Sequence, residues 1–142
     1  MKTLIISGSR NAEGQTARAA DAVLEGAIKA GAEVERIFLP ELAIERCRQC
    51  ENTGWGKCKS ESRCVILDDH VSIFEKIVEA NGVIFATPVY FGDLSESMRS
   101  FIDRMRRLCT RGGRGEEIKG KPVIGLCVAG NSGRGATECC AI

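Results

Sequence analysis

Residues 2–16 read KTLIISGSRNAEGQT, an apolar segment that runs through a small polar loop into the start of a helical pattern. The continuous apolar run at residues 3–6 is typical of a strand that is covered on both faces in a parallel sheet. The loop supplies flexible backbone amides, hydroxyl groups and one cation. A helix that starts after it would point its unsatisfied N–H groups and the positive end of its dipole at this loop. The stretch therefore predicts a strand, an anion-binding loop and a helix, in that order.

The spacing of the glycines narrows the kind of phosphate that this loop suits. Five residues separate Gly8 from Gly14, and Gln15 stands where a Walker A loop carries lysine, which argues against triphosphate hydrolysis. Arg10 occupies the second glycine position of a dinucleotide-binding loop, where the backbone must approach a pyrophosphate closely. The kind of phosphate that still fits this loop is a terminal monophosphate. If only this loop is considered, the alternative interpretation is a plain β-α turn with N-capping residues and no ligand.

Length and composition predict one cytoplasmic domain over residues 1–142. The formal net charge of +1 gives no sign of a nucleic-acid or membrane partner, and no apolar run approaches the ~20 residues that cross a bilayer. Eight cysteines without a secretion signal suggest reduced thiols, metal ligands or core residues rather than a disulfide framework.

Strand and helix patterns alternate along the rest of the chain. Helices are expected over 14–30, from 69 onward and over 94–108, and strands over 34–39, 82–86 and 123–128. This alternation indicates an α/β fold with a doubly wound parallel sheet and right-handed crossovers. His70, the single histidine, is expected to be a solvated residue of a first helical turn, and the basic residues between Arg99 and Lys121 are expected to form a solvated helix face.

Three polar loops follow the carboxyl ends of the first, third and fourth strands: SGSRNAEGQT, TPVYFGD and GNSGRG. In an open α/β sheet, ligands bind at these ends, at the switch point in the strand order. Tyr90 and Phe91, with Pro88 and the backbone of Gly92, suit a flat heteroaromatic ring, and the third loop offers polar groups to a ring edge. A monophosphate joined to a planar ring indicates FMN.

These three motifs, with the longer segment TPVYFGDLSESMRSFIDR, resemble the flavodoxin-like NAD(P)H-dependent FMN reductases and, within that group, the iron–sulfur flavoproteins. The resemblance implies a flavodoxin-like sheet of strand order 2-1-3-4-5. It also implies ligands for the FMN phosphate, for the isoalloxazine ring and for the pyrimidine side of that ring. The implied phosphate ligands are Ser9, Arg10, Gln15 and Thr16. The residues implied to line the isoalloxazine ring are Pro88, Val89, Tyr90, Phe91 and Gly92. Those implied at its pyrimidine side are Gly130, Asn131 and Ser132. Members of this fold close with a fifth strand and a last helix, so we expect this chain to be incomplete at its C-terminus.

The long connection after the second strand is rich in cysteine. Cys47, Cys50, Cys58 and Cys64 have the spacing C-x2-C-x7-C-x5-C within an insertion at about residues 44–69. Four thiolates on one loop can hold an iron–sulfur cluster or a tetrahedral zinc ion, and free, partly buried thiols are the third interpretation. The resemblance favours a [4Fe–4S] cluster, because iron–sulfur flavoproteins carry a compact cysteine motif before a V-I-x-D-D segment. Trp55, between the second and third cysteines, is expected to cover the loop or an oligomer interface.

The sequence thus predicts an FMN-dependent oxidoreductase that takes a hydride from NAD(P)H and passes electrons to a small-molecule or redox-protein acceptor. No residue is assigned as a general acid or base, because the cofactor carries the redox chemistry. One alternative is an electron carrier in which FMN and a cluster relay electrons between partner proteins. Another is a non-redox interaction module that zinc stabilises. The resemblance also implies a homodimer or homotetramer.

Overall fold

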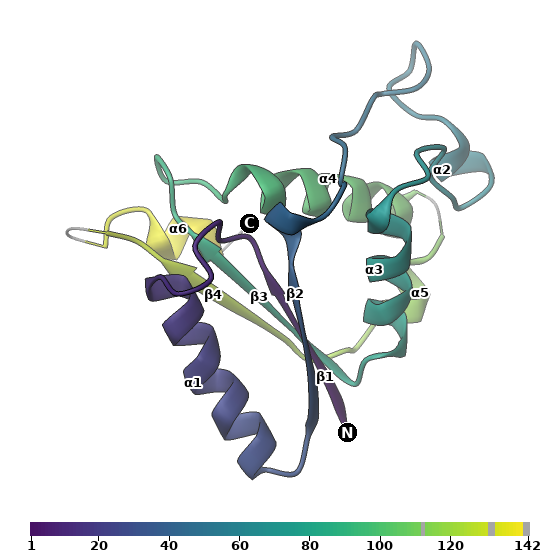
Figure 1. Cartoon of the computed structure of the whole chain (residues 1–142). Helices are drawn as coiled ribbons and strands as arrows, with labels where there is room; N and C mark the ends of the chain where they lie inside the picture. Colours follow the sequence, from purple (N-terminus) through teal and green to yellow (C-terminus); the bar gives the residue numbers. More distant parts are fainter. Residues whose placement is uncertain (112, 131–132, 141–142) are drawn as a thin grey trace.

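The structure is a computed structural model that describes residues 1–111, 113–130 and 133–140 (Figure 1). Its strands are β1 (Lys2–Ser7), β2 (Glu33–Phe38), β3 (Gly82–Pro88) and β4 (Val123–Val128). Its longer helices are α1 (Gln15–Lys29), α3 (Asp69–Glu79) and α4 (Glu96–Thr110). Short helices occur at η1 (Leu39–Glu41), α2 (Lys57–Ser60), α5 (Gly115–Ile118) and α6 (Ala136–Cys140). Within the described residues, no helix is long and apolar enough to cross a membrane.

The four strands form one parallel sheet in the order β2-β1-β3-β4. This order agrees with the flavodoxin-like order predicted from the sequence, and the switch in strand order lies between β1 and β3. Ser7, at the end of β1, lies opposite both Phe38 of β2 and Ala86 of β3. Pro88, at the end of β3, lies opposite Val128 of β4. The loops that leave β1, β3 and β4 therefore start side by side.

Helices cover both faces of this sheet, α1 on one side and α3 and α4 on the other (Figure 1). Ile5 of β1 packs with Ala20 of α1 on the first face. Leu4 and Ile6 face the other way and join a buried cluster with side chains of α3 and α4, among them Ile73, Ile77, Met98 and Phe101. Because both faces of β1 are buried, its apolar run is continuous, as predicted.

The helix α3 begins at Asp69, where the sequence predicts its start. Asp68, and not Asp69, is the N-cap residue, and its side chain accepts a hydrogen bond from the backbone N–H of His70 at 3.2 Å. An aspartate at this position satisfies one of the helix's unpaired N–H groups. The cap also fixes the chain direction at the point where the cysteine-rich insertion ends.

The prediction that His70 is solvated is wrong. Its side chain is fully buried, and its ring centroid lies 4.9 Å from that of Phe101. His70 precedes Ile73 by three positions, so both lie on the face of α3 that packs on the sheet. Burial, reinforced by the charge of Arg104 and opposed by Asp68, lowers the pKa of His70 to about 4. The ring is therefore neutral at pH 7.

Candidate functional site

The loop after β1 packs against the first turn of α4. The Gly8 N–H donates to the Ala86 carbonyl at 2.8 Å, and Ser97 Oγ donates to the Gly8 carbonyl at 3.3 Å. A Cβ atom on Gly8 would lie 2.4 Å from Ser95 Oγ, closer than real Cβ atoms approach. A residue without a side chain is therefore needed where this loop crosses the start of α4.

The N-terminus of α1 opens toward the same loop. Gly14 precedes the helix with an extended backbone and makes no side-chain cap, so the first N–H groups of α1 are available to another acceptor. Ser9 and Thr16 are buried beside this helix end. Such an arrangement is suited to an anion, in agreement with the loop's sequence.

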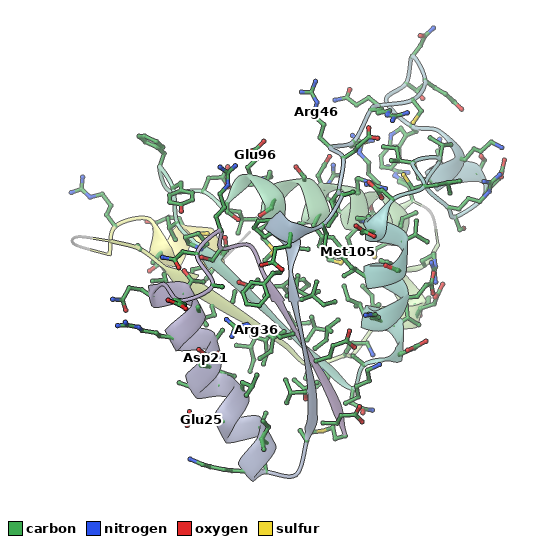
Figure 2. The ribbon with its side chains drawn as sticks, in the orientation of Figure 1. Asp21, Glu25, Arg36, Arg46, Glu96 and Met105 are labelled. Carbon is green, nitrogen blue, oxygen red and sulfur yellow. The ribbon has the colours of Figure 1, made fainter. Side chains whose placement is uncertain are left out.

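Two of the predicted phosphate ligands are exposed. Gln15 is the first residue of α1 and faces solvent. Arg10 is also exposed and pairs at 3.2 Å with Glu96, the first residue of α4. Figure 2 labels Glu96 at this end of α4. The one cation of this loop thus lies near the start of α4, and it shares a surface cavity with residues of η1 and α4.

The loop after β3 carries two exposed aromatic rings on a tight turn. Tyr90 and Asp93 exchange two backbone hydrogen bonds of 3.0 Å, and Phe91 and Gly92 between them have φ angles of 53° and 78°. Positive φ at both central residues is the mark of a type I′ turn. Phe91 therefore adopts a conformation that favours glycine, although its ring is fully exposed and packs on nothing in the core. Strain of this kind is typical of functional loops.

The loops after β3 and β4 are in contact. The Val89 N–H donates to the Val128 carbonyl at 2.9 Å. A Cβ atom on Gly135, whose φ is 85°, would lie 2.7 Å from Gly92 Cα. Gly130 is exposed at the start of the loop after β4. The other two predicted flavin contacts of this loop, Asn131 and Ser132, lie outside the described residues.

The four cysteines of the insertion line one cavity. Their thiols are free of disulfides; Cys50 is exposed and Cys47, Cys58 and Cys64 are half-buried. Four cationic side chains share the lining of this cavity: Arg48, Lys57, Arg104 and Arg107. The structure therefore brings together all four residues that the sequence proposed as ligands, in a strongly basic surrounding.

The thiols that line this cavity are not gathered around one point in the described structure. Within the described residues, no group of three or more Cys, His, Asp or Glu side chains is arranged to hold one ion. A tetrahedral zinc site needs its sulfurs about 2.3 Å from one centre, whereas a cubane cluster binds each thiolate to a different iron, so its sulfur ligands lie farther apart. Arg104 and Arg107 each bury an Nε atom that has no hydrogen-bond partner in the described part of the chain. Cluster sulfurs accept such hydrogen bonds.

The two ends of the insertion are joined at its base. The Ala43 N–H donates to Asp69 Oδ2 at 2.8 Å, and the Asp69 N–H donates back to the Ala43 carbonyl at 3.1 Å. The Glu45 N–H donates to Asp68 Oδ2 at 2.8 Å. The insertion therefore leaves and re-enters the body of the protein at one place, and Figure 1 shows it projecting beyond α4.

Arg104 of α4 reaches into this base. Its side chain is 2% exposed and donates to Asp68 Oδ2 at 2.6 Å and to Cys64 Sγ at 3.4 Å. It also donates to the backbone carbonyls of Glu45 at 3.1 Å and Ile66 at 3.3 Å. Burial alone would raise the pKa of Asp68, but the hydrogen bond from Arg104 and those from backbone N–H groups hold that pKa below its usual range.

For Arg104, these contacts correct the expectation that the basic residues between 99 and 121 form a solvated helix face, whereas Arg106 and Lys119 are exposed as expected. Arg104 lies three positions after Phe101 and four before Leu108, and both of these residues are buried. Positions three and four apart share one face of a helix, so Arg104 lies on the inner face of α4. The helical spacing of the apolar residues of α4 includes position 104, and this spacing could have identified Arg104 as a buried residue.

Arg107, one turn further along α4, holds the tip of the insertion. Its guanidinium donates to the Gly54 carbonyl and lies over the Trp55 ring, with 5.0 Å between the guanidinium carbon and the ring centroid. Trp55 thus packs against α4 through Arg107, and its expected role in covering the loop or an oligomer interface stays a prediction. One helix face therefore contacts the cysteine region at both its base and its tip.

Comparison with known proteins identifies the family of this chain. The NADPH-dependent FMN reductase family matches residues 1–140. The chain belongs to this family. An iron–sulfur flavoprotein of Methanocaldococcus jannaschii is 35% identical over 138 residues, which are 97% of this chain and 66% of the relative. Another, from Archaeoglobus fulgidus, is 34% identical over 105 residues, which are 74% of this chain and 46% of the relative.

The fold has a counterpart among solved structures. The NAD(P)H:quinone oxidoreductase from Methanothermobacter marburgensis superposes with a TM-score of 0.69 at 18% identity, over 97% of this chain and 71% of that chain. With the observed strand order, this confirms the flavodoxin-like fold predicted from the sequence. The chain spans about half to two thirds of the length of the two flavoproteins that it matches.

Proposed function

We propose that this chain binds FMN at the three loops and transfers electrons from NAD(P)H to an acceptor. The observation that carries this proposal is the convergence of the loops: Gly8 packs on the start of α4, and Gly135 packs on Gly92. Membership of the FMN reductase family supports both the flavin and the reduced pyridine nucleotide.

In this proposal, the chain's own residues bind and orient the flavin. The open N-terminus of α1 would take the phosphate, with Ser9, Arg10, Gln15 and Thr16 around it. The loop after β3 would line the isoalloxazine ring through Pro88, Val89, Tyr90, Phe91 and Gly92, and the loop after β4 would meet its pyrimidine side through Gly130, Asn131 and Ser132. Bound FMN supplies the redox chemistry, accepting a hydride from NAD(P)H and releasing electrons to the acceptor.

We also propose that Cys47, Cys50, Cys58 and Cys64 hold a [4Fe–4S] cluster, which would supply one-electron transfer. Three observations support this: the shared cavity, the arginine Nε–H groups that have no hydrogen-bond partner among the described residues, and the similarity to iron–sulfur flavoproteins. α4 links the two sites, because Ser97 contacts the loop after β1 and Arg104 contacts Cys64. Seven positions of helix correspond to about 10 Å at 1.5 Å per residue. Electrons could then leave singly to a redox protein or in pairs to a small molecule.

A visible absorption spectrum of anaerobically purified protein, with iron and acid-labile sulfide analysis, tests both parts. Flavin bands that NADH or NADPH bleaches, together with about four irons per chain, would support them. Flavin without iron would leave a simple reductase and remove the cluster. Colourless protein with stoichiometric zinc would overturn both. Steady turnover with a quinone would separate an enzyme from an electron carrier that has no substrate of its own.

We further propose that the protein works in the cytoplasm as a homodimer or homotetramer. The exposed rings of Tyr90 and Phe91 support a contact with a second copy or with the flavin. Light scattering measured with and without FMN tests the assembly. A monomer under both conditions would overturn this part alone.

A further inference from the structure

We propose that Arg104 is a positioning residue of the cysteine site, which holds Cys64 in place and raises the reduction potential of the cluster proposed there. This inference rests on the proposed function, because it concerns the centre that the four cysteines would hold. It adds to that function a cationic side chain from α4, the helix that also contacts the loop after β1.

The geometry of the guanidinium carries the first part of the inference. Its two terminal nitrogens are occupied at the base of the insertion: Nη1 by Asp68 and the Glu45 carbonyl, Nη2 by Cys64 Sγ and the Ile66 carbonyl. These contacts fix Cys64 relative to α4. The remaining donor, Nε, is buried without a hydrogen-bond partner among the described residues, and Arg104 lines the cavity of the cysteines. A sulfur acceptor in that cavity would satisfy it.

The charge of Arg104 carries the second part. Reduction adds one negative charge to a cluster, and a nearby cation stabilises the more negative state, so the potential rises. Burial strengthens this effect, because Arg104 is 2% exposed and little water screens it. Asp68, which contacts the same guanidinium at 2.6 Å, acts in the opposite direction. Removing Arg104 and removing Asp68 should therefore shift the reduction potential of the cluster in opposite directions.

The chain offers a matched control on the same helix. Arg106 lies on the exposed side of α4 and pairs with Asp103 at 2.7 Å. It is not among the residues that line the cysteine cavity. Arg106→Met removes the same charge and a similar length of side chain without touching that cavity.

The experiment is an EPR-monitored redox titration of the anaerobically purified holoprotein, with iron and sulfide counted for each variant. Relative to wild type, Arg104→Met should titrate at a lower potential, Asp68→Asn at a higher potential, and Arg106→Met at the same potential. Arg104→Lys keeps the charge but not the planar donor set, so it should fall between Arg104→Met and wild type. Where Arg104→Met yields no soluble protein, Asp68→Asn compared with Arg106→Met still tests the sign of the shift, because it removes only the negative partner of the pair.

Equal potentials in Arg104→Met and Arg106→Met, or in Asp68→Asn and Arg106→Met, would overturn the inference while leaving the cluster in place. Shifts of the same sign in Arg104→Met and Asp68→Asn would also overturn it, because a merely structural role predicts no opposition between them. Wild-type protein without iron and sulfide would instead remove the proposed cluster itself, and this inference with it.

Discussion

A Cβ atom placed on Gly135 would lie 2.7 Å from the Cα of Gly92, so the loops that leave β3 and β4 meet backbone to backbone. Both glycines have positive φ angles, 85° and 78°. The contact leaves no room for a side chain between the two loops that are proposed to hold the flavin ring. It therefore offers a way to disturb the ring site by substituting Gly135, a residue that is not itself a proposed ring contact.

Gly135→Ala should weaken FMN binding by about tenfold or more and destabilise the protein by about 1–2 kcal/mol, since the new methyl group forces the loops apart. Titration of apoprotein with FMN by fluorescence quenching measures the first effect. Gly120→Ala is the control, because Gly120 has a φ of 75° but nothing within 4 Å of its added Cβ. Gly120→Ala should destabilise the protein by a similar backbone strain but leave its affinity for FMN unchanged. Equal losses of affinity in both variants would show that the loop contact is irrelevant.

Gly8→Ala should destabilise the protein by about 1–3 kcal/mol, because its Cβ would overlap Ser95 Oγ and crowd Met98 Cβ at 2.9 Å. The displaced loop should also bind FMN more weakly through its phosphate, so riboflavin, which lacks the phosphate, should be less affected than FMN. Gly26→Ala in α1 provides the contrast, since its Cβ meets nothing within 4 Å. It should stabilise the protein by about 0.5–1 kcal/mol in urea denaturation.

Phe91→Gly should separate stability from flavin binding. The substitution relieves a left-handed backbone and removes a ring that is fully exposed, so the apoprotein should lose no stability. Affinity for FMN should nevertheless fall several-fold if the ring stacks on the isoalloxazine. Unchanged affinity together with a change in oligomeric state would assign Phe91 to an interface between copies instead.

His70 should make the protein acid-sensitive in a defined pH window. Its pKa is about 4 in the folded protein, against about 6.5 in an unfolded chain, so the unfolded state binds more protons below pH 6.5. The free energy of unfolding should therefore fall as the pH drops from about 6.5 toward 4, by on the order of 3 kcal/mol. In His70→Leu this component should be missing. Parallel pH profiles for the two proteins, from urea denaturation at each pH, would contradict this assignment.

The sheet and its loops were predictable because their signals are local. The continuous apolar run of β1 indicates that both of its faces are buried. The glycines in the loops indicate where the backbone turns and where two backbones approach one another. Parallel pairing then places the ends of β1, β3 and β4 together without any further information. The left-handed Gly31 after α1, with a φ of 81°, follows the same local logic.

His70 and Arg104 were misjudged because their environment depends on partners far away in the chain. Each lies at helical spacing from buried apolar residues, but composition made a solvated position the simpler interpretation. Arg104 is tolerated inside because Asp68, 36 positions earlier, supplies a carboxylate. His70 is tolerated because its uncharged ring packs beside Phe101. The cysteine spacing identified the ligand candidates but not the arginines of α4 that line the same cavity.

The closed base of the cysteine insertion has a consequence for how such proteins diverge. The Ala43–Asp69 and Glu45–Asp68 hydrogen bonds bring the two ends of the insertion together. Residues inside the insertion can therefore be added, deleted or replaced without changing the order or pairing of the strands. Lengthening a loop whose ends are already joined costs little entropy, about 0.6 kcal/mol for each doubling. The region behaves as an exchangeable cassette, so a grafted cysteine lobe of different spacing should be accepted by the same scaffold as long as these two anchors and the inner face of α4 remain.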